Sequence, residues 1–210
     1  MNCTHPIRLI KKIPRDIYPD GLEVPCGKCL NCRIQKRKEW ALRCYHELSY
    51  HDRSSFVTLT YDEDHVPDNY SLSKHHVQKW LKRLRKQMTN SLKYFLCGEY
   101  GSRTLRPHYH ALLYGIGLTN TDRNLVMSTW DMCDWSTQRK AFDVVCPETI
   151  EYVTGYIHSK LSGDQELYMY RLTQREIPFR LISHGIGLQY VNDNKDQLSD
   201  NMYVTQRGLS

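Results

Sequence analysis

The sequence has no apolar run long enough to cross a membrane. Its longest apolar stretch, residues 111–118, has eight residues, whereas a membrane-spanning helix needs roughly 18 to 20. Residues 1–5 do not open an apolar signal segment, and the chain contains neither an internal repeat nor a low-complexity tract. We therefore expect a soluble protein that has no membrane partner and is not exported.

The chain has enough apolar residues for one domain with its own core. Of its 210 residues, 40% are hydrophobic and 11% aromatic, which excludes a wholly disordered chain. The formal net charge is +6 and is unevenly distributed. Residues 1–50 have ten Lys or Arg against five Asp or Glu, and residues 74–106 have nine against one. This local positive charge favours a nucleic-acid partner, although a basic helix is often only a solvated face.

Eight cysteines in a chain without an export signal indicate reduced thiols that bind metal or fill the core. Cys26, Cys29 and Cys32 follow a C-x2-C-x2-C spacing, which is a strong sign of ligand chemistry. Cys3 or His5 could complete a tetrahedral zinc site, and Cys3 is our candidate for the fourth ligand. An iron–sulfur cluster is an alternative, although the ferredoxin run lacks its fourth cysteine here, and so are buried thiols without metal. The other four cysteines are expected in the core: Cys44, Cys97, Cys133 and Cys146.

Hydrophobic periodicity predicts an alternation of helices and strands. Prolines and a glycine in the first 25 residues indicate a loop or extended arm. Strands are expected at residues 54–61, 93–100 and 108–115, and helices at 28–50, 73–88, 121–135 and 147–161. The last two strands are typical of a hairpin, so we expect an α+β fold with a single antiparallel sheet and covering helices. Beyond residue 163 the pattern weakens, and we expect an extension with a partly disordered tail.

Two histidines in a predicted strand form a candidate metal site. His108 and His110 flank Tyr109, and alternate residues of a strand project from the same face of the sheet. Glu99 lies near the end of the preceding strand, so a short hairpin would bring its carboxylate toward the two imidazoles. Such a mixed nitrogen and oxygen site suits Mg²⁺ or Mn²⁺, or zinc if the site is closed. Surface histidines that form only hydrogen bonds are the competing interpretation.

A pair of tyrosines follows on the last predicted helix. Tyr152 and Tyr156 are four residues apart and hence share one face, with Lys160 one turn further along. They lie on the flank of the apolar stripe that begins with Ile150 and Val153, so they are not simply core residues. A tyrosine can act as a covalent nucleophile when a metal or a base assists its phenol. The plainer interpretation is an amphipathic tyrosine at the boundary of the core.

Three ordered motifs resemble those of the HUH endonucleases. They are FVTLTY at residues 56–61, CGEYG-x4-RPHYH at 97–110 and YVTGYIHSK at 152–160. Together with PCGKCLNCR at residues 25–33, they are most similar to the replication-initiation proteins of microviruses, particularly the gokushovirus type. The resemblance spans about residues 1–190.

The resemblance implies three parts and a catalytic site. A Cys-rich arm and basic helix would occupy residues 1–52, an HUH or RRM-like nuclease core 53–163, and a C-terminal extension 164–210. Ser159 stands where the family has the first of two lysines. The implied ligands of a catalytic Mg²⁺ or Mn²⁺ are His108, His110 and Glu99, and the implied catalytic residues are Tyr152, Tyr156 and Lys160.

The implied activity is initiation of rolling-circle replication in the cytoplasm of a bacterial host. One tyrosine would nick single-stranded origin DNA, leaving a 5′-phosphotyrosyl link and a free 3′-OH, and the displaced strand would later be rejoined into a circle. Host polymerase and helicase are implied partners. The cations expected to contact DNA are Lys79, Lys82, Arg83, Arg85, Lys86, Arg33, Arg37 and Arg106.

Two alternatives come from other classes. One is a non-catalytic, zinc-stabilised module that binds single-stranded nucleic acid, in which His108 and His110 are merely structural. It predicts that replacing both tyrosines by phenylalanine leaves the function intact. The other is a different HUH enzyme, such as a relaxase or a single-strand transposase. Two tyrosines on one helix disfavour the single-tyrosine transposases, and the cysteine segment favours the viral initiators.

Overall fold

The computed structural model describes residues 3–11, 13–138, 140–159, 168 and 170–199. Within these ranges, no helix combines the length and apolar character needed to span a bilayer. Two 3₁₀ turns, Asp68–Tyr70 and Trp135–Thr137, join the regular elements. The helices and strands, in chain order, are β1 (Ile7–Leu9), β2 (Leu22–Val24), α1 (Leu30–Leu48), β3 (Ser54–Leu59), α2 (Lys74–Gln87), β4 (Lys93–Tyr100), β5 (Pro107–Tyr114), α3 (Asn120–Thr129), β6 (Phe142–Asp143), α4 (Pro147–Ser159), β7 (Phe179–Ile182), α6 (Leu188–Asp193) and α7 (Lys195–Ser199).

A five-stranded antiparallel sheet forms the centre of the molecule. Its strand order is β6-β3-β5-β4-β7, and the expected hairpin, β4 and β5, lies in the middle. This confirms the α+β class with a single sheet and covering helices. A separate two-stranded sheet of β1 and β2 lies in the N-terminal arm.

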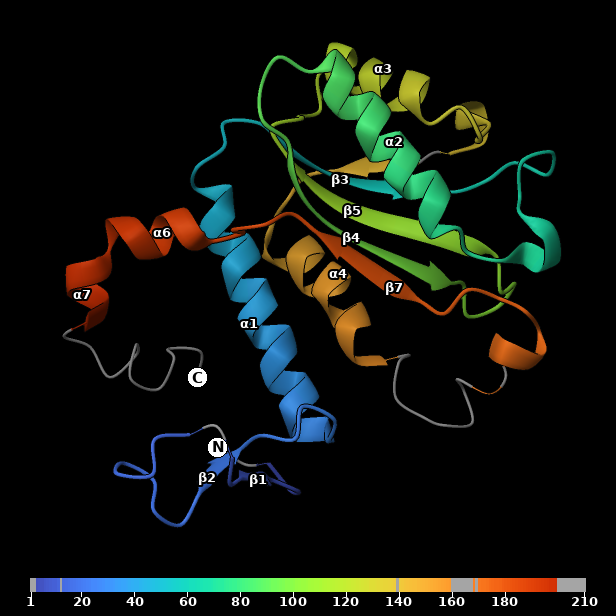
Figure 1. Ribbon diagram of the computed structural model, residues 1–210. Helices are drawn as coiled ribbons and strands as arrows, with labels where there is room; N and C mark the ends of the chain where they lie inside the picture. Colours follow the sequence, from blue (N-terminus) through green and yellow to red (C-terminus); the bar gives the residue numbers. More distant parts are fainter. Residues whose placement is uncertain (1–2, 12, 139, 160–167, 169, 200–210) are drawn as a thin grey trace.

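The two faces of the sheet are covered by different helices. α2 and α3 lie over one face, and α1 and α4 over the other (Figure 1). Side chains alternate along β5, so Tyr109, Ala111 and Leu113 pack under α2, while Leu112 and Tyr114 pack with residues of α1 and α4. We call these the α2 face and the α4 face. The core is therefore two apolar layers separated by the sheet.

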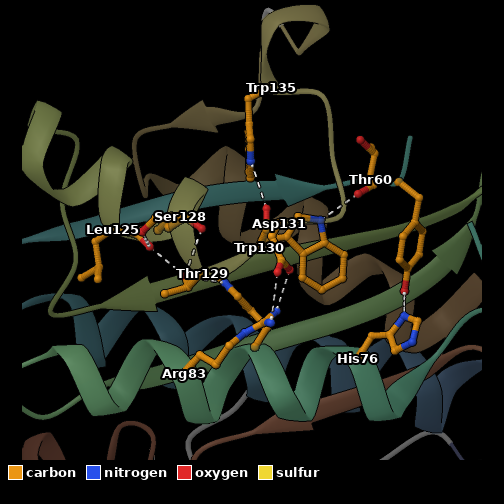
Figure 2. Close-up of polar contacts among 12 residues, drawn as sticks. Thr60, His76, Arg83, Leu125, Ser128, Thr129, Trp130, Asp131 and Trp135 are labelled. Atoms are coloured by element: carbon orange, nitrogen blue, oxygen red, sulfur yellow. Dashed lines mark hydrogen bonds and ion pairs between the residues drawn. The ribbon is translucent and has the colours of Figure 1, made fainter. Parts of the chain in front are cut away.

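The α2 face follows closely from the sequence pattern. Ser73 caps α2 by accepting a hydrogen bond from the His76 N–H, as expected. The apolar stripe of the helix is buried on the sheet: Val77, Trp80, Leu81 and Leu84. Two indole N–H groups are satisfied in this layer, since Trp80 donates to Thr129 Oγ1 at 3.2 Å and Trp130 donates to the Thr60 carbonyl at 2.8 Å (Figure 2).

Three short elements do not follow from the pattern. The arm expected to be a loop contains β1 and β2, which pair from Ile7↔Val24 to Leu9↔Leu22. The two-residue strand β6 pairs with β3. β7 lies in residues 164–210, where we expected only an extension, yet it forms one edge of the central sheet. Strands of two to four residues have too few positions for an alternating pattern to stand out. The expected disordered tail falls partly on residues 200–210, outside the described residues.

A buried carboxylate ties α1 to the sheet and to the C-terminal segment. Glu47 is 1% exposed and pairs with Lys93 Nζ at 2.8 Å and with His51 Nε2 at 2.7 Å, and it accepts the Gly187 N–H at 2.8 Å. Gly187 has φ +72°, and a Cβ there would lie 2.9 Å from the Arg43 carbonyl oxygen. Glycine therefore permits the close approach to α1 that places its N–H against the carboxylate.

Replacing Glu47 tests this junction. Burial alone raises the pKa of Glu47, but the hydrogen bonds from Lys93, His51 and Gly187 outweigh it and hold the pKa below the ordinary value of 4.5. We expect Glu47→Gln to lower the free energy of unfolding at pH 7 by about 2–4 kcal/mol, measured by urea denaturation, because Lys93 loses its counter-charge.

The pH dependence provides the control. A depressed pKa stabilises the fold above about pH 4.5, and this contribution is lost as the pH falls through the folded-state value. The difference between wild type and Glu47→Gln should therefore shrink below pH 4.5. Glu39→Gln, on the same helix, should change stability by less than about 0.5 kcal/mol. Equal losses in both variants would contradict the assignment.

Candidate active site

The hairpin register brings the three candidate metal ligands together. Glu99 is the direct cross-strand partner of His108, and His110 is the partner of Cys97 two residues further along β4. All three side chains point to the α4 face. Glu99 is 7% and His110 6% exposed, and His108 is half-buried. A carboxylate and an imidazole this deeply buried require specific partners.

His110 is held from both sides. Its Nε2 lies 3.1 Å from Glu99 Oε1, and its Nδ1 lies 3.0 Å from Thr58 Oγ1. Thr58 is the cross-strand neighbour of His110 on β3. A carboxylate only accepts, so here Nε2 carries the proton, whereas the threonine hydroxyl can either donate or accept. His110 can therefore exchange its Nε2 proton for a metal and pass the role of donor to Nδ1.

His108 is oriented by its own strand. Its Nδ1 donates to the Arg106 carbonyl at 2.7 Å, which leaves the lone pair on Nε2. Burial lowers the pKa of His108, which favours the neutral form that binds metals. The two rings are parallel within 10° with centroids 6.4 Å apart. Two imidazoles and a carboxylate fit a divalent cation in donor chemistry. Among the described residues, however, their ligand atoms do not form a group within 4.8 Å of one another.

The paired tyrosines lie directly over these ligands. The Tyr156 ring stacks on the His110 ring at 5.5 Å, and the Tyr152 ring meets it edge-on at 5.2 Å. The two tyrosine rings are themselves 5.1 Å apart. Tyr152 is 48% exposed, whereas Tyr156 is half-buried against the core. Burial, a hydrogen bond to Tyr152 and the charge of Glu99 raise the pKa of Tyr156, so its phenol keeps its proton.

Arg37 of α1 is the expected DNA contact that the fold brings to the tyrosine helix. It donates to the Glu151 carbonyl at 3.3 Å, and its guanidinium lies 3.7 Å from the Glu151 carboxylate. A Cβ built at Gly155 would be 3.7 Å from Arg37 Cζ. Arg37 therefore lies beside the turn of α4 that joins the two tyrosines. Arg33 lies one turn earlier on α1, and Lys160 lies outside the described residues.

The basic residues of α2 lie on the other side of the sheet. Lys79, Lys82, Arg85 and Lys86 are carried by the helix that covers the α2 face, and its apolar stripe is turned to the sheet. Arg83 pairs with Asp131 at 3.1 Å (Figure 2). Of these five expected DNA contacts, the structure brings none to the tyrosines. Arg106 is on the loop before β5, where it pairs with Glu63, donates to the Tyr61 carbonyl at 2.9 Å and lies over the Tyr70 ring.

Four cysteines gather at the start of α1. The sulfur atoms of Cys3, Cys26, Cys29 and Cys32 all lie within 4.8 Å of one another, and none forms a disulfide. Cys26 and Cys32 are 3.9 Å apart, as are Cys3 and Cys29. Four thiolates around one tetrahedral zinc ion would be about 3.8 Å apart, given Zn–S bonds of about 2.3 Å. The cluster could therefore hold one metal ion, and Cys3 completes it rather than His5.

Backbone N–H groups already support thiolates in this cluster. Those of Cys32 and Thr4 donate to Cys29 and lower its pKa to about 5, and those of Cys29 and Lys28 lower the pKa of Cys26. Desolvation raises the pKa of Cys32 to about 12. A bound cation favours the thiolate form of every ligand. An iron–sulfur cluster holds its cysteines around several metal atoms, which the close sulfur packing does not suit.

The sequence alone does not single out three residues on this face. Thr58 and Phe56 lie on β3 on the α4 face, and Phe56 stacks on His110 at 5.7 Å and meets Tyr152 edge-on at 6.0 Å. Arg180 is on β7, the strand that the pattern does not predict. Of the cysteines expected in the core, Cys44, Cys97 and Cys133 are buried, while Cys146 is only partly buried.

Comparison with known proteins places the chain in a family. The model of the replication-associated protein ORF2 family matches residues 54–161, just over half of the chain. The chain belongs to this family. The match begins at β3 and ends beyond the tyrosines of α4, so it covers all three motifs. The resemblance to phage replication-initiation proteins is thereby confirmed.

Curated relatives extend the similarity beyond the matched region. The chain is 26% identical to the replication-associated protein VP4 of Bdellovibrio phage phiMH2K, over 97% of this chain and 71% of the relative. It is 28% identical to the replication-associated protein ORF2 of Spiroplasma virus 4, over 89% of this chain and 63% of the relative. It is 34% identical to the replication-associated protein ORF4 of Chlamydia phage 1, over 44% and 24%. The chain thus spans only part of each relative's length. No solved structure matches it.

The cysteine cluster gives a direct test. We expect Cys3→Ser to abolish stoichiometric zinc binding by the purified protein, measured by elemental mass spectrometry, because a tetrahedral site loses one of its four thiolates. His5→Ala is the matched control and should keep the metal, since His5 is exposed and outside the cluster. Zinc retained in Cys3→Ser but lost in His5→Ala would reverse the ligand assignment.

Proposed function

We propose that this protein initiates rolling-circle replication by nicking single-stranded DNA with a tyrosine of α4. The observation that carries the proposal is the packing of Tyr152 and Tyr156 around His110, itself paired with Glu99. A histidine pair with a buried carboxylate beneath two adjacent phenols suits metal-assisted phosphoryl transfer better than it suits a structural core. Membership of the replication-associated protein family and the names of the phage relatives support the same role.

The nicking step transfers a phosphoryl group to tyrosine. The phenolic oxygen forms a bond to phosphorus, the bond from phosphorus to the 3′ oxygen breaks, and the 3′ oxygen takes up a proton while the phenol gives up its own. The products are a 5′-phosphotyrosyl link and a free 3′-OH that primes synthesis. His108, His110 and Glu99 would hold Mg²⁺ or Mn²⁺, which supplies Lewis-acid stabilisation of the phosphate.

The chain's own residues position the reacting groups. The His110 ring contacts both phenol rings, so one side chain fixes the two nucleophiles relative to each other. The second tyrosine would cut the regenerated origin, so that the displaced strand can be joined into a circle. Arg37, next to Glu151 and Gly155, is the described cation nearest to this helix turn in the set we expected, and Lys160 would add another. Both would offset negative charge on the phosphate.

The partners follow from the same role. Single-stranded origin DNA is the substrate, and the host polymerase and helicase would extend and unwind it in the bacterial cytoplasm. Zinc in the cysteine cluster would fix the arm to the start of α1, the helix that carries Arg33 and Arg37. The cations of α2, on the far side of the sheet, would contact DNA outside the cleavage site.

Replacing the tyrosines tests the nuclease. Wild-type protein is incubated with Mn²⁺ and single-stranded oligonucleotides that tile its own genome, and SDS-resistant adducts are mapped by peptide mass spectrometry. We expect the link on Tyr152 or Tyr156, and we expect the double variant Tyr152→Phe, Tyr156→Phe to lose adduct formation by a factor of about 10³ or more while still binding DNA. Tyr45→Phe, at an exposed tyrosine of α1, should form the adduct at the wild-type rate.

Absence of any adduct from the wild type on every tile, with binding intact, would instead favour a non-catalytic binding module. Adducts that persist in the double variant would move the nucleophile elsewhere in the chain.

Thr58 tests the metal assignment separately. Its hydroxyl meets His110 Nδ1, and loss of such an outer partner typically weakens metal binding about 10–100-fold. Thr58→Val should therefore raise the Mn²⁺ concentration for half-maximal adduct formation by about that factor. Thr60→Val is matched in chemistry, but its hydroxyl meets Cys133 Sγ instead, so its metal requirement should be unchanged. An unchanged requirement in both would remove Thr58 from the site.

A further inference from the structure

Arg180 lies in the same cross-strand row as the site histidine. The register pairs Thr58 with His110, His110 with Cys97, and Cys97 with Arg180. These four residues therefore form one line across β3, β5, β4 and β7. Neighbouring strands are roughly 4.8 Å apart, so the backbones of His110 and Arg180 are separated by roughly 10 Å.

The side chain of Arg180 belongs to the α4 face. In β7, Phe179 and Leu181 pack with the cluster under α2, whereas Ile182 packs with the cluster under α4. Alternation places Arg180 on the same side as Ile182. Between Arg180 and His110 in this row lies only the small, buried side chain of Cys97. The guanidinium thus shares a face with the tyrosines and the candidate metal ligands.

Arg180 has a charge that the described protein does not neutralise. It is half-buried, and desolvation lowers its pKa. Within the described ranges, it forms no ion pair with an acidic side chain. Glu99, two residues from Cys97 on the same face, is already engaged with His110 at 3.1 Å. A partly desolvated guanidinium without a counter-charge favours an anionic ligand, and its planar fork of donors suits a phosphate.

We propose that Arg180 binds a backbone phosphate of the single-stranded DNA that lies across the α4 face. The proposal rests on the function proposed above and adds a residue from outside the region that the family model matches. It also gives β7 a role in the site, because this strand carries the arginine to the edge of the row that contains His110. Arg37 on α1 and Arg180 on β7 would then contact the strand from different elements of the same face.

Binding measured against salt concentration tests the contact. The probe is a fluorescent oligothymidine of about 16 nucleotides, and its anisotropy reports the affinity. One phosphate contact contributes about 0.7 to the slope of log K against log salt, which is about fivefold in affinity at roughly 0.1 M salt. Arg180→Gln should lose both, whereas Arg180→Lys should keep the slope. Lys195→Gln, which removes one positive charge on α7, should match the wild type.

A measurement on the unaltered protein keeps the test valid if Arg180→Gln does not fold. Phenylglyoxal modifies accessible guanidinium groups, and peptide mass spectrometry reads the extent at Arg180. Protection of Arg180 by the oligonucleotide supports the contact. An unchanged slope in folded Arg180→Gln, or equal modification of Arg180 with and without DNA, would overturn it. Failure of the nuclease proposal is seen separately, as the absence of a wild-type adduct.

Discussion

The pairing register of β4 with β5 is the constraint on which the candidate site depends. Because Glu99 faces His108 and Cys97 faces His110, a carboxylate and two imidazoles meet on one face of the sheet. Side chains alternate with a period of two, so a slip by one residue would turn the histidines away from Glu99 and from α4. Buried residues on both faces of the hairpin oppose such a slip, since it would also exchange the two apolar sets. The core and the site are thus specified by the same register.

The sheet also separates two positively charged surfaces. The tyrosines, Arg37 and Arg180 lie on the α4 face, while the lysines of α2 lie on the opposite side. A DNA strand bound at the tyrosines therefore cannot contact the outside of α2 without passing around the edge of the sheet. The two surfaces are suited to different segments of DNA, and long substrates can engage both while short ones engage one.

The sequence predicts the parts of the fold that have long periodic patterns. The helix at 28–50, the capped helix after Ser73 and the hairpin are all confirmed with small shifts at their ends. Proximity of Glu99 to the histidines also follows, because a hairpin brings residues together locally. Contacts between distant segments do not follow. Spacing alone could not choose Cys3 over His5, and an amphipathic helix shows which of its sides is buried but not which face of the sheet it covers.

The late position of β7 has a consequence for synthesis of the protein. Its partner β4 ends at Tyr100, but the pairing residues Phe179–Ile182 are translated about 80 residues later. Until they leave the ribosome, one edge of β4 exposes unpaired backbone groups, a state prone to association with other strands. The Gly187 N–H that reaches Glu47 arrives later still. Completion of the sheet is therefore coupled to translation of the C-terminal segment, and a nascent chain stopped before residue 179 would display the tyrosine motif without the strand that borders it.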